Sequence, residues 1–320
     1  MAVSVTATVL NEVHDIPGLV VTVTDQTLAP DEVIIVDGGS TDGTWEWLLN
    51  AKTQYPTLVP IRDESCNLKH SPGPIARGRN VAIRAASSDI IACADAGCLY
   101  RHDWLANLTE PISSGTAEYA VGGSCLYPDA PTVWDVASAP FFGVKLDPNE
   151  PTKSCTARSM AFRKELWQRA GGFPETVLLG EDTLFDAQAR KLVTPAFVQR
   201  AKAFYRPRHT LGSAIRQLAS YAVADGALGI RPARLFRNLA RCIAEVAAVI
   251  ALRWSPIPFF VIFALENYFA FRLDWRSLQR ASYSQLVARL IFSLIVPWIV
   301  TWNQIKGSLT KANQRNRQNT

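Results

Sequence analysis

Carboxylates occur at three points of this sequence where a predicted strand ends or a predicted helix begins. Asp37 follows the β-branched run Val33–Val36, and Asp95 follows the apolar run Ile90–Ala94. The pair Glu181-Asp182 opens a helical segment after Gly180. Carboxylates at the carboxyl edge of a parallel sheet lie where ligands bind, so they can accept hydrogen bonds from a nucleotide or hold a divalent cation. A further carboxylate can take the proton of an attacking hydroxyl group.

Each of these carboxylates also has a purely structural interpretation, and the residues alone leave both open. An aspartate at the position of Asp37 can simply cap a turn. Asp95 stands in an Asp-Ala-Gly turn, which is weak evidence by itself. Acidic residues are preferred in the first turn of any helix, which accounts for Glu181-Asp182 without catalysis.

Two arginines lie between the first two acidic positions, in the segment Gly73-Pro74-Ile75-Ala76-Arg77-Gly78-Arg79-Asn80. At the start of a helix they can clamp phosphate oxygens, with help from the amino end of the helix. The alternative is a surface helix whose arginines are solvated.

Strands and helices alternate from residue 3 to about residue 108, which predicts β-α-β units and a mostly parallel sheet. Strands are predicted at 3–10, 33–36, 58–61 and 90–94, and helices at 18–25, 44–55, 75–86 and from about 102. Between 110 and 160 the pattern is mixed, with a strand predicted at 117–123 and a Pro-rich loop at 127–151. Helical spacing returns at 164–170 and 184–191.

The composition of the 320 residues fits one large domain with an appendage, or two domains. Six cysteines form no C-x-x-C pair and four histidines are scattered, so a zinc site is not expected. Residues 1–5 lack the features of a signal peptide, so we expect reduced thiols in a cytosolic setting.

The last ninety residues differ from the rest in both charge and hydropathy. Residues 231–320 contain 13 Lys/Arg and 3 Asp/Glu, a net charge of +10, whereas the first 230 residues have a net charge of −5. The basic part is also the apolar part, which is unlike a nucleic-acid-binding tail and favours a membrane surface. We expect no nucleic-acid partner.

Three apolar segments follow residue 231, at Cys242–Leu252, Trp254–Leu265 and Leu290–Trp302. Each is shorter than the roughly 18–20 residues of a clean membrane span. Interfacial or re-entrant helices and two short spans are both compatible with this pattern, and a soluble helical subdomain is the alternative. Tryptophans beside arginines favour a membrane interface, and the number of spans stays open.

The motifs together resemble family 2 glycosyltransferases. Asn11-Glu12, the run Val36–Thr44, Ala76–Asn80, Asp95-Ala96-Gly97 and Gly180-Glu181-Asp182 occur in the order found in that family, over roughly residues 3–230. The resemblance implies an α/β GT-A (Rossmann-like) fold with a mostly parallel central sheet flanked by helices. It also implies a nucleotide-sugar donor, a divalent cation (Mg²⁺ or Mn²⁺) and inversion at the anomeric carbon.

The resemblance assigns roles to particular residues. Asp37 would contact the nucleobase, with Asn11 and Glu12 lining the same pocket. Asp95 would serve the ribose or the metal, and Arg77 would lie near the diphosphate. Asp182 would be the general base, with Glu181 beside it.

Two departures from the family pattern qualify these assignments. Gly97 stands at the third position of the usual D-x-D motif, so the metal would rest on Asp95 together with phosphate oxygens, water or a further residue that the motif does not identify. The segment Gln217–Tyr221 stands where processive synthases have Q-x-x-R-W, and it lacks the arginine and the tryptophan, so a processive polymerase is disfavoured. Arg208, Gln217 and Tyr221 resemble the segment that closes the active site in polysaccharide-building relatives.

The sequence therefore predicts a catalytic domain at 1–230 and a helical, membrane-associated region at 231–320. The expected activity is inverting transfer from a nucleotide-sugar, with a UDP-sugar favoured, to a lipid-linked or glycan acceptor. The expected place is the cytoplasmic face of a bacterial inner membrane, in exopolysaccharide or cell-envelope glycan synthesis. The alternatives are a non-catalytic scaffold with the same fold and, less favoured, a sugar nucleotidyltransferase. A nucleotidyltransferase would have a Gly-rich loop with Arg or Lys after the first strand, and the segment Leu10–His14 is not such a loop.

Overall fold

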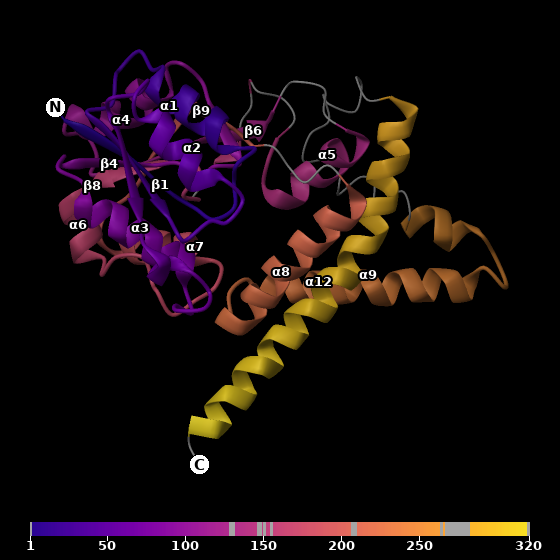
Figure 1. The fold of residues 1–320 in the computed structure, drawn as a ribbon. Helices are drawn as coiled ribbons and strands as arrows, with labels where there is room; N and C mark the ends of the chain where they lie inside the picture. The colour runs from indigo at the N-terminus through magenta and orange to yellow at the C-terminus, as the bar shows by residue number, and fades with distance from the viewer. Residues whose placement is uncertain are drawn as a thin grey trace. The chain divides into compact units, whose positions relative to one another are not determined.

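A computed structural model describes residues 2–127, 132–145, 149, 152–153, 156–205, 210–262, 265 and 282–318, and side chains up to residue 310. The chain forms two units (Figure 1). Unit 1 comprises Met1–Tyr127 and Pro148–Arg206, and unit 2 comprises Pro128–Asp147 and Pro207–Thr320. Each unit is described separately below.

Unit 1 is built on a sheet whose first half is parallel, as the sequence predicts. Four strands pair in the order β3-β2-β1-β4, all parallel. Strands β1, β2 and β4 are buried on both faces of the sheet, which is typical of parallel strands, whereas the edge strand β3 is only partly buried. These strands are β1 (Val3–Val9), β2 (Glu32–Asp37), β3 (Leu58–Arg62) and β4 (Ile90–Cys93).

Beyond β4 the sheet is mixed. It continues in the order β8-β6-β9-β5, with β7 paired to β6, and only β6 and β9 are parallel neighbours among these described strands. An irregularity between Gly122 and Gly123 shifts the register of β6 against β9. The strands are β5 (Cys98–Tyr100), β6 (Tyr119–Leu126), β7 (Thr152–Lys153), β8 (Met160–Arg163) and β9 (Ala196–Tyr205).

Helices connect and cover these strands (Figure 1). One hydrophobic core lies between the sheet and α3 and α7, with Phe162, Phe173 and Phe185 at its centre; the rings of Phe173 and Phe185 stack at 4.4 Å. The helices of unit 1 are α1 (Ile16–Thr24), α2 (Thr44–Ala51), η1 (Glu64–Cys66), α3 (Pro74–Ala85), α4 (Trp104–Ser113), α6 (Lys164–Arg169) and α7 (Glu181–Leu192).

Unit 2 is helical in its described residues. The long helix α12 packs against α8 at two glycines: a Cβ at Gly226 would meet the carbonyl of Gln304 at 1.9 Å, and one at Gly307 would meet that of Val223 at 2.0 Å. The helices are α5 (Val133–Ser138), η2 (Ala139–Phe142), α8 (Leu211–Leu228), α9 (Pro232–Ala251) and α12 (Tyr283–Gln318). Among the described residues, one helical stretch, Tyr283–Thr310, is long and apolar enough to cross a membrane, a test that a core helix of a soluble protein also passes.

One sequence prediction about local structure is wrong, and several strands were missed. The predicted loop at 127–151 contains α5 and η2, because Thr132 and Asp135 form a capping box that starts a helix there. Strands β5, β7, β8 and β9 were not predicted. Helix α8, placed in the catalytic domain by the sequence, packs with α12 in unit 2. The functional boundary at residue 230 stays a prediction.

Candidate functional site

Strand β2 delivers Asp37 to the carboxyl edge of the sheet. The side chain is fully buried, and its carboxylate accepts hydrogen bonds from the N–H groups of Gly39 (3.1 Å) and Ser40 (3.1 Å) and from the Ser40 hydroxyl. Gly39 has φ of +91°, a conformation that favours glycine. Asp37 therefore fixes the turn after β2, and its contact with a nucleobase stays a prediction.

The loop after β1 is hydrogen-bonded to the turn after β2 and to the start of α2. The N–H of Asn11 donates to Ser40 Oγ (2.8 Å), and Asn11 Oδ1 accepts from the N–H of Thr41 (2.9 Å). The N–H of Glu12 donates to Thr44 Oγ1 (2.9 Å). The structure thus brings together three residues predicted for one pocket, Asn11, Glu12 and Asp37, through hydrogen bonds to the turn.

A buried arginine joins the second and third acidic positions. Arg79 Nη2 donates to Asp95 Oδ1 (2.7 Å), and its Nε lies 3.5 Å from Glu181 Oε1. Its guanidinium also lies over the ring of Phe173, 5.8 Å from the centroid. Nε and Nη1 have no hydrogen-bond partner among the described residues, although both atoms are buried. Arg79 therefore joins Asp95, which follows β4, and Glu181, which begins α7, at one site.

Glu181 and Asp182 are adjacent in the first turn of α7 but differ in environment. Gly180, with φ of +86°, precedes this turn. Glu181 is buried, and burial together with the neighbouring charge of Asp182 raises its pKa to about 7, against the opposing effect of Arg79. The Asp182 carboxylate is partly exposed and accepts from the N–H groups of Thr183 (2.6 Å) and Ala157 (3.4 Å). The pair thus offers one carboxyl group that holds a proton near neutrality and one that solvent reaches.

Comparison with known proteins identifies the family. Residues 4–170, more than half of the chain, match the sequence profile described as "Glycosyl transferase family 2". The chain belongs to this family.

Curated and solved relatives agree with this assignment. Glycosyltransferase AglE of Haloferax volcanii is 30% identical over 193 residues, which is 58% of this chain and 60% of AglE; the match thus spans less than two thirds of that relative. Mannosyltransferase PcManGT from Pyrobaculum calidifontis, solved with GDP-Man and Mn²⁺, superposes with a TM-score of 0.52 at 19% identity, over 99% of this chain and 87% of PcManGT. S. aureus TarS 1-349, solved with UDP-GlcNAc, superposes with a TM-score of 0.51 at 16% identity, over 99% of this chain and 92% of that chain. The superpositions show that the chain has the GT-A fold of these solved structures.

Arg77 has different contacts from Arg79. Its Nε donates to Ser65 Oγ (2.8 Å) and its Nη1 to Glu175 Oε2 (3.3 Å), with 40% of the side chain exposed. Ser65 is in turn held by Asp63, which caps η1. The diphosphate contact predicted for Arg77 is untested, whereas the contact with Asp95 belongs to Arg79.

Few side chains in the described residues are placed to bind a divalent cation. In the described part of the chain, no group of three His, Cys, Asp or Glu side chains is placed to hold a metal ion. Asp95 is about one-third exposed at the end of β4, and Oδ1 is paired with Arg79. This fits a cation such as Mg²⁺ that takes one protein carboxylate and completes its shell with substrate phosphates and water. Asp95 is the residue that would provide the carboxylate.

Two of the residues predicted to close the active site lie on α8 of unit 2. Gln217 Nε2 donates to the Tyr221 hydroxyl (3.1 Å), and the ring of Phe142 meets Tyr221 edge-on at 5.9 Å. Arg208 lies outside the described residues. The acceptor role of these three residues stays a prediction.

Sequence reasoning overlooked what positions Asp95. The Tyr100 hydroxyl accepts from the Asp95 N–H (2.8 Å) and donates to the carbonyl of Arg158 (2.9 Å). Burial holds the pKa of Tyr100 well above its ordinary value, so the hydroxyl keeps its proton. The burial of Arg79 could have been predicted from the sequence. With helical spacing, Arg79 shares one face of the helix with the apolar residues Ala76 and Ile83, which are also buried. No comparable pattern marks Tyr100.

Proposed function

We propose that the glycosyltransferase moves a sugar from a nucleotide-sugar to a hydroxyl group of a lipid-linked or glycan acceptor, with inversion at the anomeric carbon. The observation that supports this most directly is the Arg79 bridge, which places Asp95 and the Glu181-Asp182 pair at one site. Solved relatives with the same fold bind UDP-GlcNAc and GDP-Man. We favour a UDP-sugar as the donor.

Asp182 is the proposed general base. It accepts the proton of the acceptor hydroxyl while that oxygen bonds to the anomeric carbon from the face opposite the nucleotide. The bond between the anomeric carbon and the diphosphate oxygen breaks, and the nucleoside diphosphate leaves with the electron pair. Inversion follows from this single displacement. Glu181 is less suited to the base role because it is buried against Arg79, whereas Asp182 is partly exposed and within reach of an acceptor hydroxyl.

The donor pocket is proposed at the carboxyl ends of β1, β2 and β4. Asp37, Asn11 and Glu12 would shape the nucleoside end, and Arg77 would approach the diphosphate. Asp95 would hold Mg²⁺ or Mn²⁺, and a bound cation would neutralise charge on the departing diphosphate. The chain's own contribution is to fix Asp95 through Arg79 and Tyr100 before the donor arrives.

The proposed location is the cytoplasmic face of a membrane, in exopolysaccharide or cell-envelope glycan synthesis. Support comes from the net charge of +10 in residues 231–320 and from the apolar stretch Tyr283–Thr310. We accordingly propose residues 1–230 as the catalytic domain and residues 231–320 as the membrane-associated region.

The test is nucleotide release from a panel of UDP-, GDP- and TDP-sugars by purified protein, with Mg²⁺ or Mn²⁺ and polyprenyl-phosphate or oligosaccharide acceptors. Asp182→Asn is expected to keep donor affinity, measured by calorimetry, and to lower turnover by about 10²–10⁴-fold. Asp89→Asn, an exposed aspartate of the same unit, is the control. Turnover of Asp182→Asn at the unsubstituted rate would remove Asp182 from the base role, and failure to bind any donor nucleotide would overturn the proposed function.

A further inference from the structure

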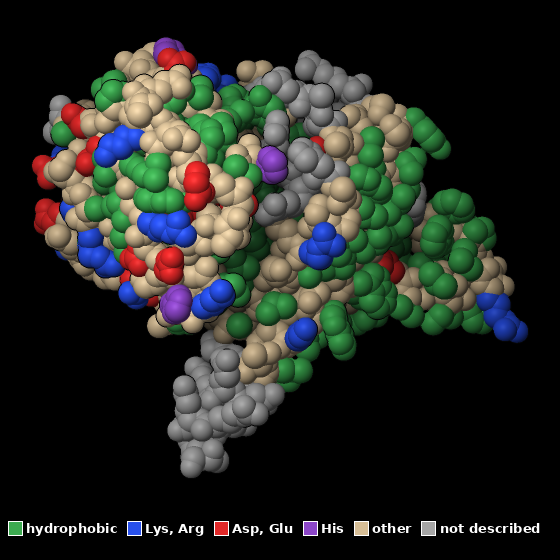
Figure 2. All heavy atoms as spheres, in the orientation of Figure 1, with side chains coloured by type: hydrophobic (Ala, Val, Ile, Leu, Met, Phe, Trp, Pro, Cys, Tyr) green, Lys and Arg blue, Asp and Glu red, His purple; other side chains and the backbone are tan. Residues whose placement is uncertain are grey.

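Helix α9 has an apolar stripe on its solvent-facing side. Phe236, Leu239, Ile243, Val246 and Ile250 recur every three or four residues, and each is between 39% and 68% exposed. That spacing puts all five on one face of the helix. Figure 2 shows hydrophobic side chains gathered on the visible face of the C-terminal helices. A contiguous apolar surface along a whole helix marks an interaction site.

A different side of α9 makes the contacts within unit 2. Asn238, Cys242 and Ala248 are buried, and Cys242 Sγ lies 3.9 Å from Thr301 Oγ1 of α12. Arg241 Nη2 donates to the carbonyl of Ser293 (3.2 Å), also on α12. The stripe is therefore not the surface that attaches α9 to α12.

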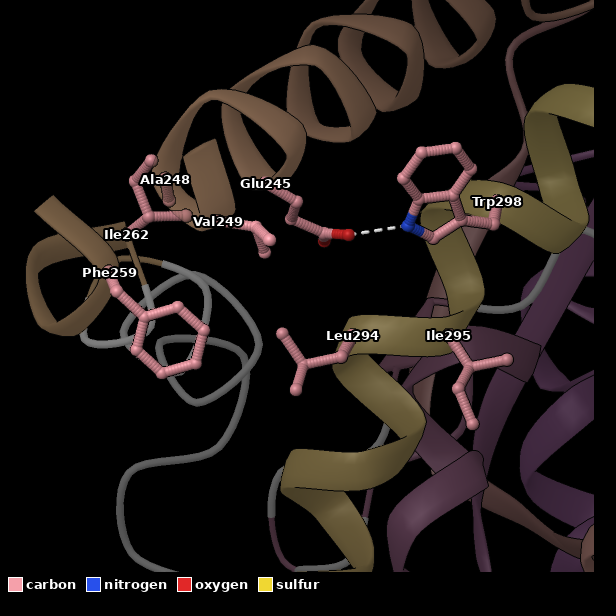
Figure 3. Close-up of a pocket in the computed structure, with 8 residues that line it drawn as sticks. All are labelled: Glu245, Ala248, Val249, Phe259, Ile262, Leu294, Ile295 and Trp298. Carbon is pink, nitrogen blue, oxygen red and sulfur yellow. Dashed lines mark hydrogen bonds between the residues drawn. The ribbon is translucent and has the colours of Figure 1, made fainter. Parts of the chain in front are cut away.

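The charges around the stripe favour an anionic partner. Arg237 is exposed and follows Phe236, the first residue of the stripe. Arg253 is exposed just beyond the end of α9, and the next residue, Trp254, is 76% exposed. Glu245 is the acidic residue of α9, and its carboxylate accepts from Trp298 Nε1 on α12 (Figure 3). An apolar face bordered by arginines and tryptophan is typical of helices that lie in a membrane interface.

A hollow with a mostly apolar lining lies between α9 and α12. Its volume is about 450 Å³, and the described residues that line it are apolar apart from Glu245 and the indole N–H that it binds (Figure 3). Phe259 and Ile262 line it from the segment after α9, and Leu294 and Ile295 from α12. Such a lining suits an acyl chain and not a phosphate group.

We propose that α9 lies in the plane of one leaflet of a bilayer that contains anionic phospholipid. The stripe enters the acyl region, Arg237 and Arg253 lie at the level of the phosphates, and the hollow receives an acyl chain. The inference deepens the membrane location given under the proposed function and does not depend on the sugar chemistry. It differs from a transmembrane placement of α9 in the depth of the stripe residues.

The experiment measures depth with spin labels on the full chain, reconstituted in phosphatidylglycerol/phosphatidylcholine vesicles. Labels are attached to Phe236→Cys, Ile243→Cys and Ile250→Cys, and collision rates with oxygen and a water-soluble nickel chelate give their depth. Labelling of the unsubstituted chain corrects for native thiols. We expect the three labels to lie about 5–10 Å below the phosphates at nearly equal depths. Arg237→Cys is the matched control and should report water or headgroups.

A spanning α9 would give a graded profile, because fourteen residues of helix rise about 21 Å between positions 236 and 250. That profile would overturn the proposal. So would labels that oxygen does not reach and that broaden one another magnetically, the signature of a second copy of the chain on the stripe. Equal depths in a protein that binds no donor nucleotide would sustain the inference and overturn the proposed function.

Discussion

At the scale of single residues, Arg79 determines the electrostatics of the site. It is almost fully buried between Asp95 and Glu181, so its removal leaves two carboxylates without their cation. Breaking a buried ion pair in this way costs about 3–5 kcal/mol. Arg79→Met should lose stability on that scale in urea denaturation, and Arg79→Lys, which keeps a charge, should lose less. Arg84→Met, at an exposed arginine of the same helix, should change stability by less than ~1 kcal/mol.

The raised pKa of Glu181 predicts a pH dependence of stability. The folded protein holds the Glu181 proton up to a pKa of about 7, whereas the ordinary value is 4.5. Between these values the folded state binds more protons than the unfolded state, so stability is highest below pH 4.5 for this group and falls as pH rises toward 7. The fall is at most ~3 kcal/mol.

Glu181→Gln removes that titration. Urea denaturation of both proteins at pH 5 and pH 8 isolates the effect, because other groups contribute equally to each. We expect the unsubstituted protein to lose more stability than Glu181→Gln over this interval. Equal losses would show that Glu181 titrates at its ordinary value.

Gly97 offers a direct test of the metal site. A Cβ at this position would have Tyr205 Cε2, at 4.0 Å, as its nearest neighbour, so a Cβ meets no steric clash here. Gly97→Asp adds a second carboxylate near Asp95 and should tighten Mn²⁺ binding in the presence of UDP by about tenfold, which corresponds to ~1.4 kcal/mol. Manganese titration followed by electron paramagnetic resonance measures it. Gly97→Asn, similar in size and uncharged, should give a much smaller gain; equal gains in both would place the metal elsewhere.

At the scale of elements, local patterns determined what could be predicted. Strands β2 and β4 are buried on both faces, so their continuous apolar runs, Val33–Val36 and Ile90–Cys93, are visible in the sequence. Strand β9 was missed because it is held by β6 and β5, which are distant in sequence, and its residues alternate only loosely. The order of motifs predicted that Asp95 and Glu181 share a site. That the Arg79 guanidinium lies between them could not be predicted from this order, because it depends on how α3 is oriented against the sheet.

The close packing of α3 against β1 determines the orientation of the helix. A Cβ at Gly78 would meet Thr8 Oγ1 at 2.1 Å, so Gly78→Ala must push the helix away from the strand. We expect a loss of about 1–3 kcal/mol in stability and a weaker Arg79–Asp95 contact. Thr8→Ala removes the closest atom, so the double variant Gly78→Ala/Thr8→Ala should recover part of the loss. A strictly additive double-mutant cycle would contradict this packing.

At the scale of the whole molecule, the two parts of the chain have opposite charge. Residues 1–230 have a net charge of −5 and residues 231–320 of +10, a division that the sequence alone displays. Anionic lipids should therefore attract the C-terminal part and repel the rest, which gives the bound enzyme one preferred orientation. The arginines near the stripe of α9 should dominate this attraction.

Charge reversal tests that expectation. Arg237→Glu/Arg253→Glu removes two exposed cations next to the stripe, at about 1 kcal/mol for each basic residue near the surface, and adds repulsion. Flotation with phosphatidylglycerol vesicles at low salt should show at least a tenfold fall in partitioning, and the difference should shrink at high salt because exposed charges are screened. Lys52→Glu/Arg200→Glu makes the same change in net charge at exposed positions of unit 1. If both pairs weakened binding equally, total charge would govern the attachment and the position of α9 would not.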